Sequence, residues 1–223
     1  MTTKKKPAVK KKAAVPKNTI DWNDALRPLL KKYRGRKHPL QYQNAYQLIV
    51  MIVLSARSSD AIVNNQAPLL FSTYPDFAAL SKAKPEELYP LIKGPGYRHK
   101  AEYIIGIAKD VVAKGSIPNQ MEALTEWKGF GRKSANVYMS QMGLPPAGVI
   151  VDLHTLRVAP RLGIAEGDDA KKMEVQLMEK VKQKDWHHLG MALTYLGRET
   201  CRPTDPHCEE CLVNTVCRYY QAT

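Results

Sequence analysis

Cysteine is absent from the first 200 residues of this 223-residue chain, and all four cysteines lie in its last 23 residues. Also absent is any uninterrupted apolar run approaching the roughly 20 residues of a membrane-spanning helix. The amino terminus lacks the hydrophobic stretch that directs secretion. These absences argue against a membrane-spanning or an exported protein. We expect a cytoplasmic protein, associated with the nucleoid if its source is prokaryotic.

Acidic residues are scarce. The chain has 34 Lys and Arg against 21 Asp and Glu, a net charge of +13. The first 17 residues hold seven lysines and no acid, so six net positive charges belong to the remaining chain. We expect residues 1–18 to form a disordered basic tail, either a solvated arm or an electrostatic arm that speeds encounters with polyanions. A body that is itself basic favours nucleic acid as the partner.

Apolar residues recur at three- and four-residue spacing along most of the remaining chain, which predicts amphipathic helices. Asn44 is expected to cap one of these helices and Gly115 to end another. The expected fold class is all-α, with roughly ten to twelve helices. The clearest stripes span residues 48–53, 101–112, 173–181 and 186–196.

Two short segments interrupt this helical pattern. Val149-Ile150-Val151 looks strand-like, but it is too short to carry a sheet. Pro145-Pro146 must stop a helix, which suggests a domain boundary there.

The cysteines have the spacing Cys201-x6-Cys208-x2-Cys211-x5-Cys217. Two disulfides within one short loop are disfavoured in a chain without a secretory signal. A four-thiolate zinc site is an alternative, although such sites usually bring two paired C-x2-C knuckles. One tight pair flanked by two more distant thiolates suits a [4Fe–4S] cluster wrapped by a single loop. Spacing alone leaves both metal centres open.

A glycine hairpin precedes a predicted helix that begins near Arg132. Gly129 and Gly131 are expected to adopt backbone angles closed to other residues and to let backbone N–H groups approach a phosphate. An ordinary connection between helices is the alternative. Lys133 lies in the first helical turn, beside Arg132, where the macrodipole disfavours a cation. This placement suits a nucleophilic amine, and the alternative is a phosphate-contacting surface lysine.

Asp152 follows the apolar segment that ends at Val151. It is expected to cap the next helix, and a carboxylate at the edge of an apolar core can also stabilise a nearby developing cation. His154 has no partner at metal-ligand spacing and is expected to be a packed or hydrogen-bonding residue. His187 and His188 lie on a helix that looks buried, and we expect both to be structural.

Three blocks, in order, resemble the endonuclease III family of DNA glycosylases. The first runs from Leu54 to Asp60, the second joins the Gly129–Val137 hairpin to Val151-Asp152-Leu153-His154, and the third is Gly197-Arg198-x2-Cys201 with the cysteine loop. The resemblance covers roughly residues 22–220 of the sequence.

The resemblance implies two helical lobes with a DNA cleft between them. One lobe is a six-helix barrel with the helix–hairpin–helix, over residues 38–146. The other, over residues 19–37 and 147–223, carries a [4Fe–4S] cluster on Cys201, Cys208, Cys211 and Cys217. We expect a monomer that binds double-stranded DNA containing damaged bases or abasic sites.

The resemblance also implies the catalytic pair. Lys133 corresponds to the catalytic lysine, which displaces the base and forms a Schiff base with the deoxyribose, and elimination then cuts the strand. Asp152 corresponds to the catalytic aspartate. The expected activity is base excision repair of oxidised pyrimidines and abasic sites, by an N-glycosylase that is also an abasic-site lyase. The residues expected to contact DNA are Gly129, Gly131, Arg132, Arg57 and Tyr97.

Three positions depart from the family pattern. Arg57 stands where the family usually has Gln, and Gly96 where a bulky aliphatic wedge is usual, unless Tyr97 replaces it. Trp127-Lys128 replaces the usual Leu-Pro before the hairpin. An adenine-mismatch glycosylase is a competing interpretation, as is an abasic-site lyase or DNA-structure binder of the same fold with weak or lost base excision.

Overall fold

The computed structural model of this chain describes residues 20–223, so the predicted basic tail lies outside the described residues. All regular secondary structure in the described part is helical: thirteen α-helices and three short 3-10 helices. The all-α prediction is therefore confirmed. The helices outnumber the predicted ten to twelve because some, such as α1 and α6, are single turns. Residues 149–151, which look strand-like in sequence, belong to no strand in the described chain.

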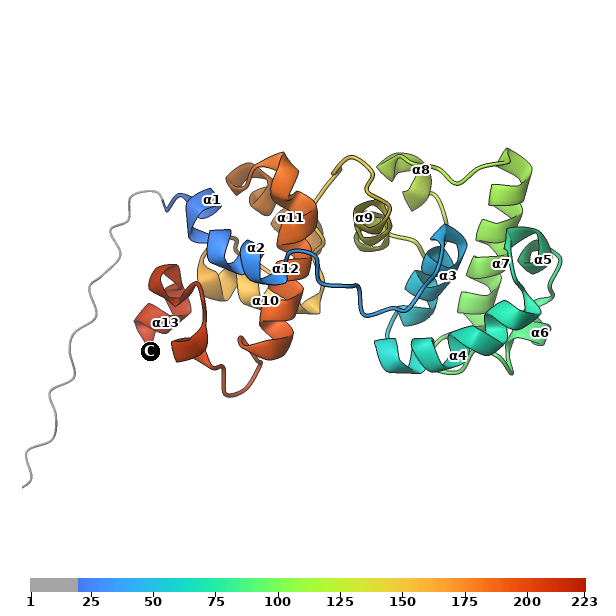
Figure 1. Cartoon of the computed structure of the whole chain (residues 1–223), viewed down its shortest axis with the longest axis horizontal. Coiled ribbons are helices and arrows are strands. Elements are labelled where there is room, and N and C mark those ends of the chain that lie inside the picture. Colours follow the sequence, from blue (N-terminus) through green and yellow to red (C-terminus); the bar gives the residue numbers. More distant parts are fainter. Residues whose placement is uncertain (1–19) are drawn as a thin grey trace, which may run out of the picture.

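The helices gather around two separate hydrophobic cores (Figure 1). The described chain, residues 20–223, begins and ends at the second core and builds the first core in between. The helices between residues 45 and 141 are α3 Ala45–Ser55, α4 Asp60–Thr73, α5 Phe77–Ser81, α6 Pro85–Leu88, α7 Tyr97–Lys114, α8 Met121–Thr125 and α9 Arg132–Gln141. The remaining ones are α1 Trp22–Ala25, α2 Arg27–Tyr33, α10 Leu153–Leu162, α11 Ala170–Lys180, η1 Gln183–Asp185, α12 Trp186–Glu199, η2 Cys208–Glu210, η3 Asn214–Val216 and α13 Arg218–Ala222.

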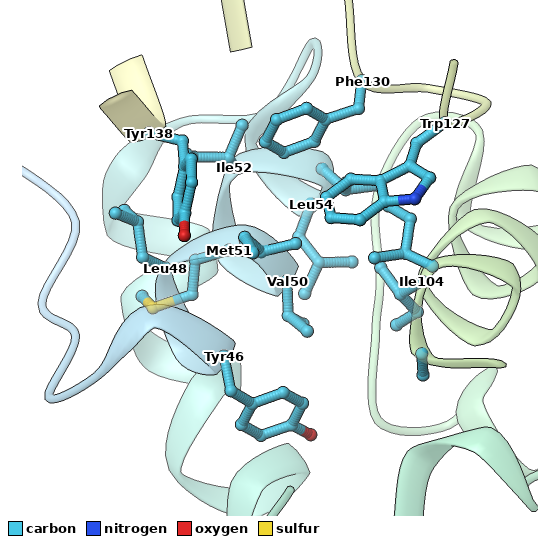
Figure 2. Packing of buried hydrophobic residues seen from close by; sticks show 14 of the residues in the cluster. Tyr46, Leu48, Val50, Met51, Ile52, Leu54, Ile104, Trp127, Phe130 and Tyr138 are labelled. Atoms are coloured by element: carbon cyan, nitrogen blue, oxygen red, sulfur yellow. The ribbon is translucent and has the colours of Figure 1, made fainter. Parts of the chain in front are cut away.

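The first core surrounds α3. Every residue from Leu48 to Leu54 is buried, because α4, α7 and α9 contact different faces of this helix. Trp127 and Phe130, on either side of Gly129, pack edge to face with ring centroids 5.6 Å apart (Figure 2). The hairpin is therefore anchored by aromatic rings directly to the core.

The second core joins both ends of the chain. Helix α2 packs against α12, and α10 packs against α12 and α13. Leu26 and Leu29 of the amino-terminal segment are fully buried there. The domain boundaries given above, 38–146 against 19–37 and 147–223, remain a prediction.

The predicted helix ends are well reproduced. Asn44 caps α3 by accepting the backbone N–H of Gln47 at 2.9 Å, and Gly115 ends α7 with φ +72°. The expected stripe on α7 is wrong at Val112, which is 49% exposed. Val112 lies in the last turn of α7, whereas Ile107, which the stripe left out, is buried.

Helix α9 lies between the two cores and contacts α3 and α8 in one and α12 in the other (Figure 1). Two ion pairs also cross from one set of helices to the other: Arg132 with Glu174, and Asp60 with Arg198. In the part of the chain that the structure describes, no helix combines the length and apolarity needed to cross a membrane.

Candidate functional site

A pocket lies where the two cores meet, and it contains both residues of the predicted catalytic pair. Lys133 reaches it from α9, and Asp152 from the start of α10. They are 19 positions apart in sequence and belong to helices of different cores. Its other polar lining residues are His38, Ser55, Asp60, Thr194 and Arg198.

Lys133 is exposed in the first turn of α9. Gly129, in the preceding turn, has φ +79°, and a Cβ there would overlap the ring of Tyr103. Glycine is therefore required at 129 by both backbone angle and space. The same expectation for Gly131 is wrong: its φ is −79°, within the range of any residue. A Cβ on Gly131 would meet nothing within 4 Å, so this position is open to an approaching ligand.

The Asp152 carboxylate is held by three hydrogen bonds. Its Oδ1 accepts the backbone N–H groups of His154 and Thr155 at 2.9 and 2.8 Å, which confirms the predicted helix cap. Its Oδ2 accepts the hydroxyl of Thr194 at 3.1 Å. Cap and hydroxyl together fix the direction of the carboxylate beside the pocket.

His38 was missed at the sequence level. It belongs to neither core and sits on the segment between α2 and α3, so no helical pattern marks it. Its Nδ1 accepts the Leu40 backbone N–H at 3.1 Å, which leaves the proton of the neutral ring on Nε2. Burial lowers the pKa of His38 to about 4; Lys133 and Arg198 add to this lowering, while Asp60 opposes it.

Asp60 and Arg198 close one side of the pocket. The Arg198 guanidinium donates to Asp60 Oδ2 at 3.0 Å, and thereby connects α4 with α12. Both residues belong to sequence blocks that carry the family resemblance. Their pairing joins positions 138 residues apart, so it could not be read from local spacing.

Arg132, predicted to contact DNA, has another partner in the structure. Its Nε and Nη2 donate to the two carboxylate oxygens of Glu174 at 2.8 and 2.9 Å. Glu174 is only 4% exposed and also accepts from Asn136 Nδ2 at 2.8 Å. Asn136 Nδ2 further donates to Val149 O at 3.3 Å. This network joins the helix that bears Lys133 to the segment that leads to Asp152.

The two loops predicted to fill the gap of an extruded base lie next to each other. Arg57 is exposed and has φ +57°, a left-handed angle that is unusual outside glycine. Gly96 is also left-handed, at φ +71°. The Tyr97 ring packs against Tyr89 at 5.2 Å between centroids and contacts the first core. In this conformation Tyr97 therefore does not replace the missing wedge.

The four cysteines surround one small apolar pocket at the end of the second core. All four are free thiols. No three His, Cys, Asp or Glu side chains within residues 20–223 are grouped closely enough to hold a single metal ion. All four thiols line this one pocket, the placement that a metal centre with four thiolate ligands requires.

Two arginines of α10 hold the cysteine loop in place. Arg157 donates to the carbonyl oxygens of Gly197 and Cys201, at 2.9 and 3.2 Å. Arg161 donates to the carbonyl oxygens of Arg202 and Pro203, at 2.6 and 3.0 Å. Burial raises the pKa of the thiols of Cys208, Cys211 and Cys217. Metal binding would have to displace these protons.

The arrangement suits chemistry on a polyanion. An exposed amine and an oriented carboxylate share one pocket, and the open start of α9 presents unpaired N–H groups of the kind that bind phosphate.

Known proteins are similar to this chain in sequence and in fold. Residues 50–183 match the model of the HhH-GPD superfamily base excision DNA repair protein. The chain is 37% identical over 198 residues to Endonuclease III of Synechocystis sp. (strain ATCC 27184 / PCC 6803 / Kazusa), covering 87% of this chain and 90% of that protein. It resembles the protein in a non-covalent Endonuclease III–DNA complex with a TM-score of 0.80 and 30% identity, over 89% of this chain and 94% of that one. A trapped Endonuclease III–DNA covalent intermediate matches with the same TM-score and identity, over 89% and 95%.

Proposed function

Because this chain belongs to the endonuclease III family of the HhH-GPD superfamily of base excision DNA repair proteins, we propose that it is a DNA glycosylase and abasic-site lyase with Lys133 as its nucleophile. The observation that carries the residue assignment is that Lys133 and Asp152 line one pocket between the two cores. A damaged nucleotide turned out of the duplex would enter this pocket, at a cost that is smallest where base pairing is already weak.

Lys133 performs the covalent step. Its neutral amine attacks C1′ of the deoxyribose, the C1′–N bond to the base breaks, and the base leaves with the bonding electron pair and takes up a proton. Loss of an amine proton and opening of the sugar ring give a Schiff base between Nζ and C1′. Removal of a proton from C2′ then expels the 3′ phosphate, which cuts the strand on the 3′ side of the lesion.

Asp152 supports this step without leaving its cap. Positive charge develops on the sugar as the base departs, and the carboxylate stabilises it or assists the proton transfers. Two backbone N–H groups and the Thr194 hydroxyl hold the carboxylate in one orientation. An oriented charge needs no rearrangement when the transition state forms.

Double-stranded DNA with a damaged base or an abasic site is the proposed substrate, bound by a monomer in the cytoplasm. Gly129 and Gly131 bring the start of α9 close to a phosphate, supported by the open space at Gly131. Arg57, between α3 and α4, and Tyr97, at the start of α7, would face the lesion. Arg132 acts through its pairing with Glu174, and at most its remaining N–H groups reach the DNA backbone.

A [4Fe–4S] cluster is the proposed cofactor, held by Cys201, Cys208, Cys211 and Cys217. When bound, it would supply four covalent links that fix the shape of the loop after α12. The free thiols, the apolar pocket and the anchoring arginines support this fit. The chain's own residues carry every chemical step.

The family assignment favours an enzyme over a DNA-structure binder without base excision. A panel of duplexes carrying thymine glycol, dihydrouracil, mispaired adenine or an abasic site tests the activity. Borohydride should trap a covalent complex with the abasic duplex, and peptide mapping should place the link on Lys133. Lys133→Gln should lower trapping by about a thousandfold or more, because it removes the nucleophile. Lys128→Gln, in the same hairpin, should trap normally. Undiminished trapping in Lys133→Gln would refute the assignment.

A further inference from the structure

Lys100 is a buried lysine beside the two loops that face the lesion. It is 7% exposed and lies in the first turn of α7, directly after the loop with Gly96. Its amine donates to Leu54 O at 2.9 Å and to Ser58 Oγ at 3.1 Å. Within the described chain, no carboxylate pairs with it. Burying a cation without a carboxylate partner costs free energy. A lysine in this place is therefore expected to have a structural or functional role, which its two hydrogen bonds identify.

Those two bonds end on either side of Arg57. Leu54 lies in the last turn of α3, and Ser58 immediately follows Arg57. The left-handed angle of Arg57 costs about 1–2 kcal/mol and persists only where the surroundings hold it. The Lys100 amine thus holds the chain both before and after the strained residue.

The second loop lies close to the first and is also held by α4. A Cβ on Gly94 would lie 3.1 Å from Ser58 Oγ, so the backbone of that loop passes close to Ser58. Gln66 Nε2 on α4 donates to Lys93 O at 3.2 Å. Ser58 therefore contacts both the amine of Lys100 and the loop that precedes α7.

We infer that Lys100 is a positioning residue that locks the Arg57 loop and the Gly96 loop into one preformed element, and that this element fills the space left by an extruded nucleotide. The inference rests on the proposed function. Gly96 offers no side chain, so Arg57 alone can reach into the duplex. Its reach depends on the backbone angle that Lys100 maintains.

This inference separates two kinds of substrate. A paired base must be unstacked and replaced, which costs a few kcal/mol and uses the inserted element. An abasic site has no base to extrude and needs the element much less. A defect in the element should therefore slow excision of a paired lesion more than cleavage at an abasic site.

Lys100→Met tests this, because Met keeps most of the volume and loses the donor. Single-turnover rates are measured with enzyme in excess on thymine glycol and abasic duplexes. Excision of thymine glycol should fall about tenfold or more, and abasic cleavage should stay within about twofold. Lys109→Met, on the exposed face of the same helix, controls for lost charge and should change neither rate.

Ser58→Ala provides a milder variant, since it removes the loop partner and leaves the bond to Leu54 O. It should shift the same ratio by about threefold, and it decides the matter if Lys100→Met does not fold. A 2-aminopurine opposite the lesion should also stack more in both variants than in the wild type, because the gap is less well filled.

An unchanged ratio in folded variants would overturn the inference. An equal loss on both substrates would also overturn it, since that is the behaviour of a residue that only supports the fold. A wild-type protein that cleaves neither duplex would refute the proposed function, and this inference with it.

Discussion

Gly148 leaves the space that the carboxylate of Glu174 fills, since a Cβ on Gly148 would overlap Glu174 Oε1. The φ of Gly148 is not in the left-handed region, so space alone requires glycine here. Glu174 cannot move aside without breaking its bonds to Arg132 and Asn136. The ion pair between Arg132 and Glu174 therefore depends on the close approach of Glu174 to Gly148.

Gly148→Ala should lower the free energy of unfolding by about 2–3 kcal/mol, because it either displaces the Glu174 carboxylate or strains the segment. Gly106→Ala is the matched control, since no atom lies within 4 Å of its Cβ position. This second change lies inside α7 and should raise stability by about 0.5–1 kcal/mol. Urea unfolding of both variants measures the difference. Equal stability of the two would contradict the close approach.

Asp152→Asn should bind DNA normally and turn over about 100-fold or more slowly. Asn is as good a helix cap as Asp, and its Oδ1 can still accept from His154 and Thr155. The change therefore removes the charge and keeps the fold. Thr194→Val removes the bond to Oδ2, together with the contact of the same hydroxyl with Gly190 O, and should slow turnover about tenfold. Binding is measured by anisotropy and turnover under single-turnover conditions; a loss confined to binding would exclude a catalytic role.

The half-buried His38 predicts a loss of stability in mild acid. Its pKa is about 4 in the folded protein and about 6.5 when unfolded, so between these values the unfolded chain binds the extra proton. Stability from the neutral ring is complete above pH 6.5 and falls as the pH drops toward 4, by up to about 3 kcal/mol. Burial lowers the pKa of His154 and His187 as well, and both add to the loss.

His38→Asn isolates the contribution of His38, since Asn can still accept the Leu40 N–H. Thermal melts between pH 4.5 and 7 should show a flatter pH dependence in this variant. His99→Asn, with a side chain that is 73% exposed, should follow the wild type. Identical slopes in His38→Asn and the wild type would show that the pKa of His38 does not change on folding.

The cysteine loop should bind about four irons per chain and little zinc. Anaerobically prepared protein should be brown and show the broad visible absorption that is typical of iron–sulfur proteins. Cys211→Ala should lose the iron and unfold the loop, because cluster binding and loop folding are coupled. Thr215→Ala, within the same loop, should keep full iron content. Stoichiometric zinc in native-source protein would contradict the assignment.

Wild-type protein should cleave abasic DNA faster than it excises paired thymine glycol. One wedge position is Gly96, which has no side chain, and the neighbouring Tyr97 ring packs against Tyr89. Restoring a wedge with Gly96→Leu has a cost that the sequence did not show. Position 96 is left-handed, at φ +71°, so Leu would be strained there by about 1–2 kcal/mol. Arg57→Gln avoids a new strain, because Arg57 already carries that angle. Equal wild-type rates on the two duplexes would show that the wedge argument is wrong.

Local patterns in the sequence predicted much of the fold. Hydrophobic periodicity located the main helices, and short-range chemistry identified the caps at Asn44, Asp152 and Gly115. These features depend on residues within one or two turns of each other. The predicted backbone angle of Gly131 was wrong, because glycine spacing alone does not distinguish a residue with a left-handed angle from one that leaves open space.

The candidate site needed tertiary information. The resemblance pointed to Lys133 and Asp152, but only the packing of α9 between the cores brings them into one pocket. The pairing of Arg132 with Glu174 joins residues 42 positions apart, and Arg132 alone looks like a free DNA contact. His38 lies on a connecting segment, where periodicity carries no signal.

The second core, completed by both ends of the chain, has a consequence for biosynthesis. Helix α2 leaves the ribosome about 150 residues before α12, its main partner. At about 5–20 residues per second, Leu26 and Leu29 stay uncovered for on the order of ten seconds. The helices of the first core are contiguous in the chain and are all made before α12. The first core can therefore be complete while the apolar side of α2, with Leu29, Leu30 and Tyr33, is still uncovered.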